Sequence, residues 1–351
     1  MNNTICYHSE KKFSIGRNSN IELLRIVSMF LVLVVHADYL ALGAPSVHDI
    51  SISYGSSFVR AYIEALSCIC VNAFILISGW FGIRFKFVRL AGLLFQIYFI
   101  NIVIYIVMRS LGFTEYMSII DWIRLLFLKY REYWFVKAYL ILYVFAPVLN
   151  AFVDNCSRSQ LKIFLIGFYI LQSIYGFYAS SEWYSGGYSP LSFMGLYLFA
   201  RYMRLYPYLW MNLNKFTDMT IYLIISALTS FCALAITPLF EKGSTLMFLY
   251  SSPLVILATI HLFLFFSKLS FNNRFINWVS ISAFAVYLLH CSIFIFQTYY
   301  LCIIKEWFET YPLTLFLLYT TSFIGALFFI AILIDKVRIA IWNGKVLVKR
   351  A

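Results

Sequence analysis

Charged residues are scarce in this chain. Asp, Glu, Lys and Arg together make up 12% of its 351 residues, whereas 62% are hydrophobic, and the mean hydropathy is +0.83. Soluble domains carry about 25% charged residues, so this composition excludes an ordinary soluble protein. Apolar runs recur along the sequence, each close to the ~20 residues that a helix needs to cross a bilayer. Because an unpaired backbone cannot lie in lipid, these runs predict an all-α, polytopic membrane protein.

Sequence motifs for nucleotide and metal chemistry are also missing. The chain has no P-loop, no GxGxxG and no HExxH. Its seven cysteines are scattered and form no CxxC pair, so we expect them to be small apolar residues and expect no metal cofactor. The net charge of +12 has no soluble basic domain to carry it. We therefore take this charge as a signal of membrane topology and expect no nucleic-acid partner.

The apolar runs predict about ten transmembrane helices. An even number places both termini on one side, and most of the 27 Lys and Arg then lie in cytoplasmic segments, as the positive-inside rule requires. We predict a cytoplasmic N-terminal tail at 1–20, a transmembrane domain at 21–336 and a basic cytoplasmic tail at 337–351, with an interfacial amphipathic helix at 118–131. The predicted spans are 21–43, 57–83, 87–110, 133–153, 161–179, 190–210, 217–239, 245–267, 278–303 and 312–335.

Two ionisable residues of the first span are the leading candidates for a functional site. Arg25 and His36 are eleven positions apart, which is three helical turns plus about 20°, so they share one face at a separation of roughly 16 Å. Ionisable groups inside a membrane are costly and usually functional. The alternatives are that Arg25 snorkels or pairs with Glu22, and that His36 bonds to a neighbouring helix.

A second group of candidates lies at the end of the second span. Ser78 and Gly79 are small and allow helices to approach closely, which is their simplest role. Arg84 and Lys86 follow in a basic cytoplasmic turn. This turn either reflects topology alone or clamps the phosphates of a charged reagent.

Five further residues are candidates for substrate binding. Glu64 could orient a histidine or arginine, or simply pair with Arg60 four residues earlier. The remaining four either contact an acceptor or have structural roles as packed, snorkelling or interfacial side chains. They are Trp134 and Lys137 near the outer end of the fourth span, Trp183 in the outer loop 180–190, and His290 in the ninth span.

These motifs resemble the acyltransferase-3 family of membrane O-acyltransferases. The resemblance rests on Glu22-Leu-Leu-Arg25 followed after ten residues by His36, on Phe74 before Ser78-Gly79, on Tyr133-Trp134-Phe135 and on Tyr287-Leu-Leu-His290. It covers about residues 18–336. The family usually has Asp where this chain has Glu22, and often has an aromatic pair where this chain has only Phe74.

The resemblance implies an acyl donor, usually acetyl-CoA, used from the cytoplasmic side. It implies an acceptor hydroxyl on a sugar of a cell-envelope polysaccharide or its lipid-linked precursor. His36 matches the family's catalytic histidine, as general base or as an acyl-carrying nucleophile, and Arg25 matches its paired arginine. Arg84 takes the place of a functionally important arginine, and with Lys86 and Ser78 it is expected on the donor side.

The expected setting is a multi-pass protein of the bacterial cytoplasmic (inner) membrane, with the lipid bilayer, acyl-CoA and a glycan or glycolipid as its partners. The alternative is a polytopic transporter or flippase that moves a glycan or glycolipid without acyl transfer. Donor dependence separates the two, because only an acyltransferase consumes acyl-CoA.

Overall fold

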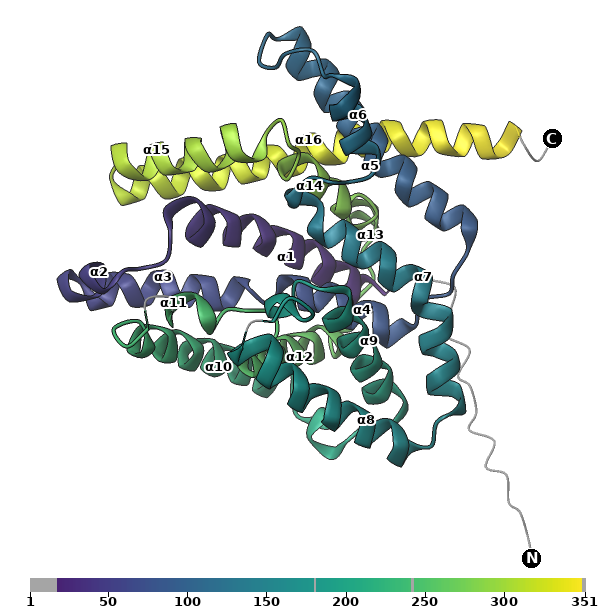
Figure 1. Ribbon diagram of the computed structural model, residues 1–351, viewed down its shortest axis with the longest axis vertical. Coiled ribbons are helices and arrows are strands. Elements are labelled where there is room, and N and C mark those ends of the chain that lie inside the picture. Colours follow the sequence, from purple (N-terminus) through teal and green to yellow (C-terminus); the bar gives the residue numbers. More distant parts are fainter. Residues whose placement is uncertain (1–17, 180, 241–242, 349–351) are drawn as a thin grey trace, which may run out of the picture.

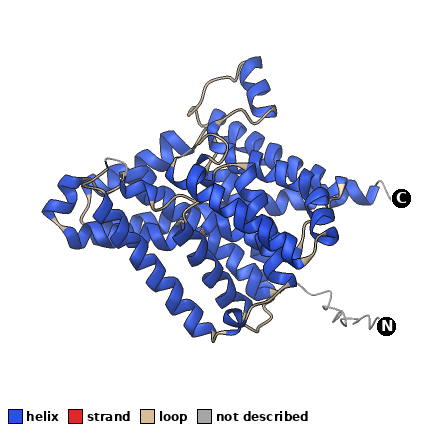
Figure 2. Ribbon diagram, turned by 60° about the horizontal axis from the view of Figure 1, so that its bottom comes forward, coloured by secondary structure: helices blue, strands red, loops and turns tan. Residues whose placement is uncertain are grey.

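The computed structural model describes residues 18–179, 181–240 and 243–348, and all regular elements in these ranges are helical (Figure 2). The α-helices are α1 (Ser19–Val35), α2 (Val47–Ile52), α3 (Tyr54–Ser67), α4 (Cys70–Phe81), α5 (Phe87–Ser110), α6 (Ile119–Leu126), α7 (Trp134–Asn155), α8 (Arg158–Leu171), α9 (Pro190–Leu205), α10 (Lys215–Ile236), α11 (Gly243–Leu246), α12 (Pro253–Ser267), α13 (Arg274–Ser280), α14 (Ala283–His290), α15 (Cys302–Thr310) and α16 (Leu313–Val348). The shorter π- and 3-10 segments are η1 (His36–Leu40), η2 (Arg131–Tyr133), η3 (Gln172–Tyr178), η4 (Ser185–Gly187), η5 (Leu209–Asn212) and η6 (Phe296–Leu301).

Seven helical stretches of the described residues are long and apolar enough to cross a membrane. The all-α, multi-pass architecture is therefore confirmed, whereas the count of about ten spans is not. Helices α9 and α12, within two of the other predicted spans, have 16 and 15 residues, fewer than a full crossing needs. The seven stretches are Ser19–Leu40, Tyr54–Phe81, Phe87–Ser110, Ile119–Asn155, Arg158–Tyr178, Lys215–Ile236 and Leu313–Gly344.

The predicted span 278–303 is divided into α13, α14 and η6. Helix α14 ends at His290, and residues 291–295 connect it to η6 without regular helix. The two residues that follow the helix, Cys291 and Ser292, are 2% and 0% exposed. Irregular backbone at membrane depth is tolerated where protein surrounds it, and here it places His290 at the end of a helix inside the bundle.

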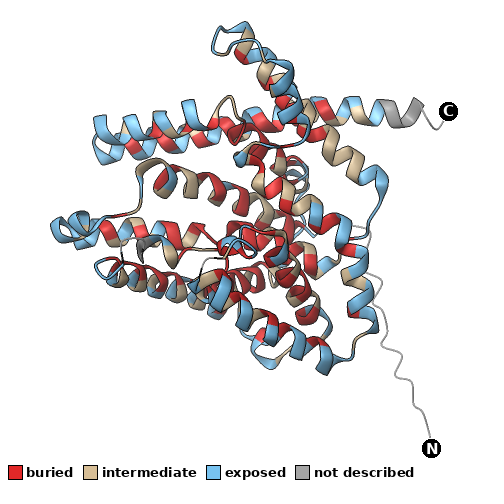
Figure 3. Cartoon of the chain, in the orientation of Figure 1, coloured by how far each residue is buried: buried red, intermediate tan, exposed pale blue. Residues whose placement is uncertain are grey.

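The stretch formed by α3 and α4 is the centre of the bundle. Its most apolar window is 72% buried, against 28–39% for the other six membrane-length stretches. Figure 3 shows the same distribution, with buried residues concentrated around α4 and exposed residues at the periphery. Large apolar side chains such as Phe87 (75% exposed) and Ile106 (55% exposed) lie on the outside, as expected for surfaces that face lipid.

Helix α6 and the adjoining end of α5 extend beyond the bundle at the top of Figure 1, whereas the rest of α5 packs against α14 and α16. Helix α6 lies within the segment predicted to be amphipathic. It starts with a capping box, in which Ser118 accepts from the backbone of Asp121 and the Asp121 carboxylate accepts from the backbone of Ser118. Its Ile119 is 79% exposed and Leu125 is buried. Helix α16 passes the predicted boundary at 336 and continues to Val348 without a break, while residues 1–17 and 349–351 of the predicted tails lie outside the described ranges.

Gly79 allows α4 to lie directly against α9. A Cβ atom added there would be 2.5 Å from the carbonyl oxygen of Tyr197 and 2.7 Å from the Cβ atom of Ala200. The first of these contacts is backbone, which cannot rotate away. The predicted close approach at the Ser78-Gly79 pair is therefore confirmed for Gly79.

Replacing Gly79 with alanine should separate the two helices and lower the free energy of unfolding by about 1–3 kcal/mol. The measurement is the thermal unfolding midpoint of the purified chain in one detergent. Gly167→Ala on α8 is the matched control, because nothing lies within 4 Å of its added Cβ atom and alanine favours helix. An equal midpoint for the two variants would contradict the close contact.

Candidate functional site

His36 lies where α1 changes from an α-helix to the π-helical segment η1. A π-turn adds a residue to the helical turn and redirects the side chains around it, and such turns are frequent at functional sites. The regular helix between Arg25 and His36 keeps the predicted spacing of roughly 16 Å along the axis. The π-turn itself has no signature in the apolar pattern of the sequence.

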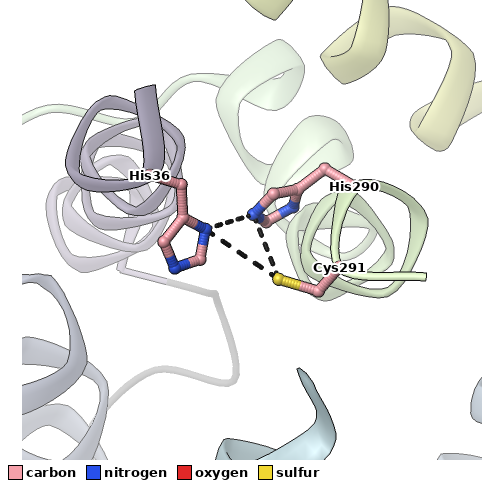
Figure 4. Close-up of side chains that lie close together, drawn as sticks. All are labelled: His36, His290 and Cys291. Carbon is pink, nitrogen blue, oxygen red and sulfur yellow. Dashed lines mark hydrogen bonds between the residues drawn. The ribbon is translucent and has the colours of Figure 1, made fainter. Parts of the chain in front are cut away.

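His36 contacts a second histidine from a distant part of the chain (Figure 4). Its Nδ1 atom is 2.9 Å from Nε2 of His290, and the two rings are 5.2 Å apart. Cys291 lies beside them, with Sγ 3.3 Å from Nε2 of His290 and 3.9 Å from Nδ1 of His36. Phe296 packs edge-on against His36 at 5.0 Å. The structure therefore confirms the alternative in which His36 bonds to a neighbouring helix, and the partner is itself one of the candidate residues.

The hydrogen bonds define which nitrogen carries each proton. Nδ1 of His290 is 2.8 Å from the carbonyl oxygen of Val286, which can only accept, so Nδ1 carries a proton. In neutral His290, Nε2 is then an acceptor and must receive its hydrogen bond from Nδ1–H of His36. This leaves the lone pair of His36 on Nε2, which points away from His290 in Figure 4. His36 is thus held in the tautomer that a general base needs.

The ligand atoms of His36, His290 and Cys291 lie within 4.8 Å of one another, close enough to surround a metal ion. Two nitrogens bound to one tetrahedral zinc ion at ~2.05 Å would be about 3.3 Å apart. The observed 2.9 Å between the two imidazoles is the length of a direct hydrogen bond. The geometry of this cluster is therefore that of a hydrogen-bonded pair with a thiol beside it.

A cavity of about 630 Å³ adjoins His36. Its lining includes His36, Tyr39, Glu64, Trp134 and Cys291. Its volume falls in the range of small-molecule sites, roughly 300–1,000 Å³. Three of its aromatic side chains pack on one another, with ring centroids 4.6 Å apart for Trp134–Tyr188 and for Tyr188–Tyr250 and 5.8 Å apart for Trp134–Tyr250.

The predicted substrate-binding residues are only partly brought together. Glu64 and Trp134 line the cavity. His290 is 0% exposed and lies behind His36, so it contacts the candidate base and not the cavity. Trp183 is 81% exposed and lies outside the lining. Lys137 donates a hydrogen bond to the backbone oxygen of Tyr130 at 3.3 Å and is also outside the lining.

The suggested pairing of Glu64 with Arg60 is wrong. Arg60 donates instead to Oδ1 of Asp38, from Nε at 2.9 Å and from Nη2 at 2.8 Å, and also to the backbone oxygen of Gly43. Segment η1 brings Asp38 to Arg60, and a carboxylate held by two guanidinium hydrogens is a strong pairing. Glu64, which is 5% exposed, therefore forms no ion pair with a described residue.

The family is shown by comparison with known proteins. A family model described as an acyltransferase domain matches residues 18–335, a range that contains His36, His290 and the whole cavity lining. The chain belongs to the acyltransferase-3 family. No curated protein and no solved structure matches the chain significantly. The resemblance found in its motifs is therefore confirmed, and the structure locates those motifs in this acyltransferase-family protein.

Arg25, matched to the family's paired arginine, lies about three helical turns from His36 along α1. Its Nη1 atom donates to both carboxylate oxygens of Glu22, at 3.0 and 3.1 Å, as the spacing of three residues suggested. With roughly 16 Å of helix between them, Arg25 cannot touch a group that His36 touches. Ser78, expected on the donor side, donates to the backbone oxygen of Phe74 at 2.8 Å.

The basic turn of this acyltransferase-family protein gains two residues that sequence reasoning missed. Arg84 and Lys86 are exposed in the segment after α4, which turns at Gly82 with φ +74°. Arg201 of α9 reaches this turn, because a Cβ atom on Gly82 would be 3.1 Å from its Nη1 atom. Arg204 lies over the ring of Trp80 at 5.1 Å. The spacing of three residues between the two arginines at the end of a span was the available signal.

Proposed function

We propose that this protein transfers a short acyl group, acetyl in the first instance, from acyl-CoA to a sugar hydroxyl of a cell-envelope polysaccharide or its lipid-linked precursor. His36 acts as the general base. The observation that carries the proposal is the chain of hydrogen bonds from Val286 through His290 to His36, which leaves Nε2 of His36 as a free acceptor beside a cavity. Acyl transfer to a hydroxyl needs such an acceptor within hydrogen-bond reach.

The proposed reaction proceeds by direct attack. The acceptor hydroxyl gives its proton to Nε2 of His36 while its oxygen forms a bond to the thioester carbonyl carbon. The carbon–sulfur bond then breaks, and the coenzyme A thiolate takes the proton back from His36. The products are the O-acyl ester and free coenzyme A, and His36 is neutral again. His290 positions His36 and accepts the hydrogen bond from Nδ1–H throughout.

The donor is proposed to enter from the end of the bundle that carries Arg25 and the turn with Arg84 and Lys86. The phosphates of coenzyme A need guanidinium or ammonium groups, and these side chains supply them. The roughly 16 Å between Arg25 and His36 suits a thioester carried on the extended pantetheine arm. This end is proposed to face the cytoplasm of a bacterial cell, where acyl-CoA is made, with the chain in the cytoplasmic membrane.

The test is transfer of radiolabel from [1-14C]acetyl-CoA by the purified full chain in lipid nanodiscs, with a glycan fraction from cells that lack the chain as acceptor. We expect label to enter the glycan fraction and to be released by mild alkali, as O-esters are. A boiled chain is the control. Label that stays in acetyl-CoA, with movement of glycolipid across the bilayer, would contradict acyl transfer and indicate a flippase.

A further inference from the structure

Two residues that line the cavity beside His36 carry buried polar atoms that no described residue satisfies. The hydroxyl of Tyr39 and the Oε2 atom of Glu64 are both buried and have no hydrogen-bond partner among the described residues, and both residues line the cavity. A buried polar atom without a partner typically costs about 1–3 kcal/mol, more when it is charged. Two such atoms on residues that line one cavity fit a ligand that supplies the missing hydrogen bonds.

The surroundings of Glu64 define which ligand groups fit. Its nearest basic neighbour in the sequence, Arg60, is held by Asp38 and Gly43. Arg131 also lines the cavity, but it is exposed, whereas Glu64 is 5% exposed. The buried part of the cavity therefore presents a carboxyl group and a phenol, whereas Arg131, the one Lys or Arg among the lining residues, lies at its exposed part. It suits hydrogen-bond donors such as hydroxyl groups and opposes phosphate or carboxylate groups.

The apolar part of the lining is aromatic. Trp134, Tyr188 and Tyr250 all line the cavity and pack on one another at 4.6–5.8 Å. Aromatic side chains offer a flat apolar surface with polar tips, which matches a ring with one hydrophobic face and hydroxyl groups at its edge. A ring with several hydroxyl groups can offer a separate partner to each of these two polar atoms while its apolar face packs on the aromatic rings.

We propose that Glu64 and Tyr39 form a hydroxyl-recognition subsite that selects a neutral, polyhydroxylated acceptor ring and rejects an anionic one. The Glu64 carboxyl accepts a hydrogen bond from one acceptor hydroxyl, and the Tyr39 hydroxyl bonds to a second. These contacts place a further hydroxyl of the same ring at His36. Glu64 is a specificity-determining residue, distinct from the base. This proposal rests on the proposed function, since it concerns the acceptor of that reaction.

The experiment measures binding in the absence of donor, with the full chain in nanodiscs. The probes are p-nitrophenyl β-D-glucopyranoside, its 6-phosphate and cyclohexylmethanol. We expect saturable binding of the neutral hexoside and at least 10-fold weaker binding of the other two. Glu64→Met should weaken hexoside binding about 10-fold, by removing a buried acceptor of similar length. Tyr39→Phe should weaken it severalfold.

Two further variants test whether any change in hexoside binding is due to the Glu64 side chain in particular. Glu64→Gln keeps a carbonyl oxygen but cannot ionise, so it should retain most hexoside binding and bind the 6-phosphate more tightly than the unmodified chain does. Glu309→Met is the matched control on α15, because the Glu309 side chain is 63% exposed and outside the cavity. It should bind every probe as the unmodified chain does. The thermal midpoint of each variant separates misfolding from lost recognition.

The outcomes distinguish this subsite from the reaction. Three results would overturn the subsite. They are no binding of the hexoside, hexoside binding that is unchanged in Glu64→Met, and binding of cyclohexylmethanol with the same affinity as the hexoside. Acetyl transfer that persists with an unchanged acceptor KM in Glu64→Met would overturn the subsite and leave the proposed function standing. Binding that depends on Glu64 without any acetyl transfer would keep the subsite and refute the acyltransferase reaction.

Discussion

Replacing His36 with alanine should lower the rate of acetyl transfer by about 10²–10⁴-fold, the usual contribution of a general base. The variant loses the Nε2 acceptor, and no other imidazole among the described residues lines the cavity. The fold should survive, because His36 is only partly buried and the cavity already adjoins it. The measurement is the initial rate of label transfer from acetyl-CoA at saturating acceptor, together with the thermal midpoint.

His48→Ala provides the matched control, since His48 is exposed on α2 and outside the cavity. This variant should keep the full rate. Added imidazole should restore part of the activity of His36→Ala by entering the enlarged cavity. A turnover within about tenfold of the unmodified chain in His36→Ala would refute the general-base assignment. Acetyl label that stays covalently attached to His36 in the absence of acceptor would indicate an acyl-histidine instead.

The second large effect is expected at His290, which acts only through His36. His290→Phe retains an aromatic ring to pack near Tyr300 and Phe296, whose rings lie 5.5 and 6.1 Å from the imidazole. It removes the acceptor for Nδ1–H of His36, so the His36 ring is free to rotate or change tautomer. We expect kcat to fall about 10²-fold, as for partners that orient a catalytic imidazole elsewhere, with little change in KM.

His290→Gln separates positioning from packing. The amide oxygen of glutamine can take the place of Nε2 and accept from Nδ1–H of His36. This variant should therefore recover most of the kcat that His290→Phe loses. Both variants are compared for kcat, acceptor KM and thermal midpoint. Equal losses in the two, or a loss confined to KM, would show that His290 does not act by orienting His36.

The composition predicted the all-α membrane architecture, because backbone groups in lipid must be hydrogen-bonded internally and a helix does this within one segment. The number of crossings was not predictable in the same way. Apolar residues at 278–303 suit a continuous helix, but Cys291 and Ser292 lie in a break that protein, and not lipid, surrounds. Burial against protein and burial in lipid require similar side chains, so the sequence pattern alone cannot separate them.

Only those features of the candidate site that depend on the spacing of residues within one helix were predictable from the sequence. The separation of Arg25 and His36 and the pairing of Arg25 with Glu22 both follow from helical geometry. The contact between His36 and His290 does not follow from helical geometry, because His290 is 254 positions away. No residue near His290 in the sequence indicates a contact with α1. Likewise Arg60 was expected beside Glu64, but the π-turn η1 presents Asp38 to it instead.

The distance between His36 and His290 along the chain also bears on biosynthesis. His36 at the end of α1 is synthesised 254 positions before His290 at the end of α14, so the two meet only after the residues between them have been made. Ser19 at the start of α1 is likewise tied to Asn277 near the other end of the sequence, with oxygens 2.9 Å apart. A nascent or truncated chain that lacks α14 therefore lacks the partner that orients His36, and the proposed reaction requires that the two segments have met.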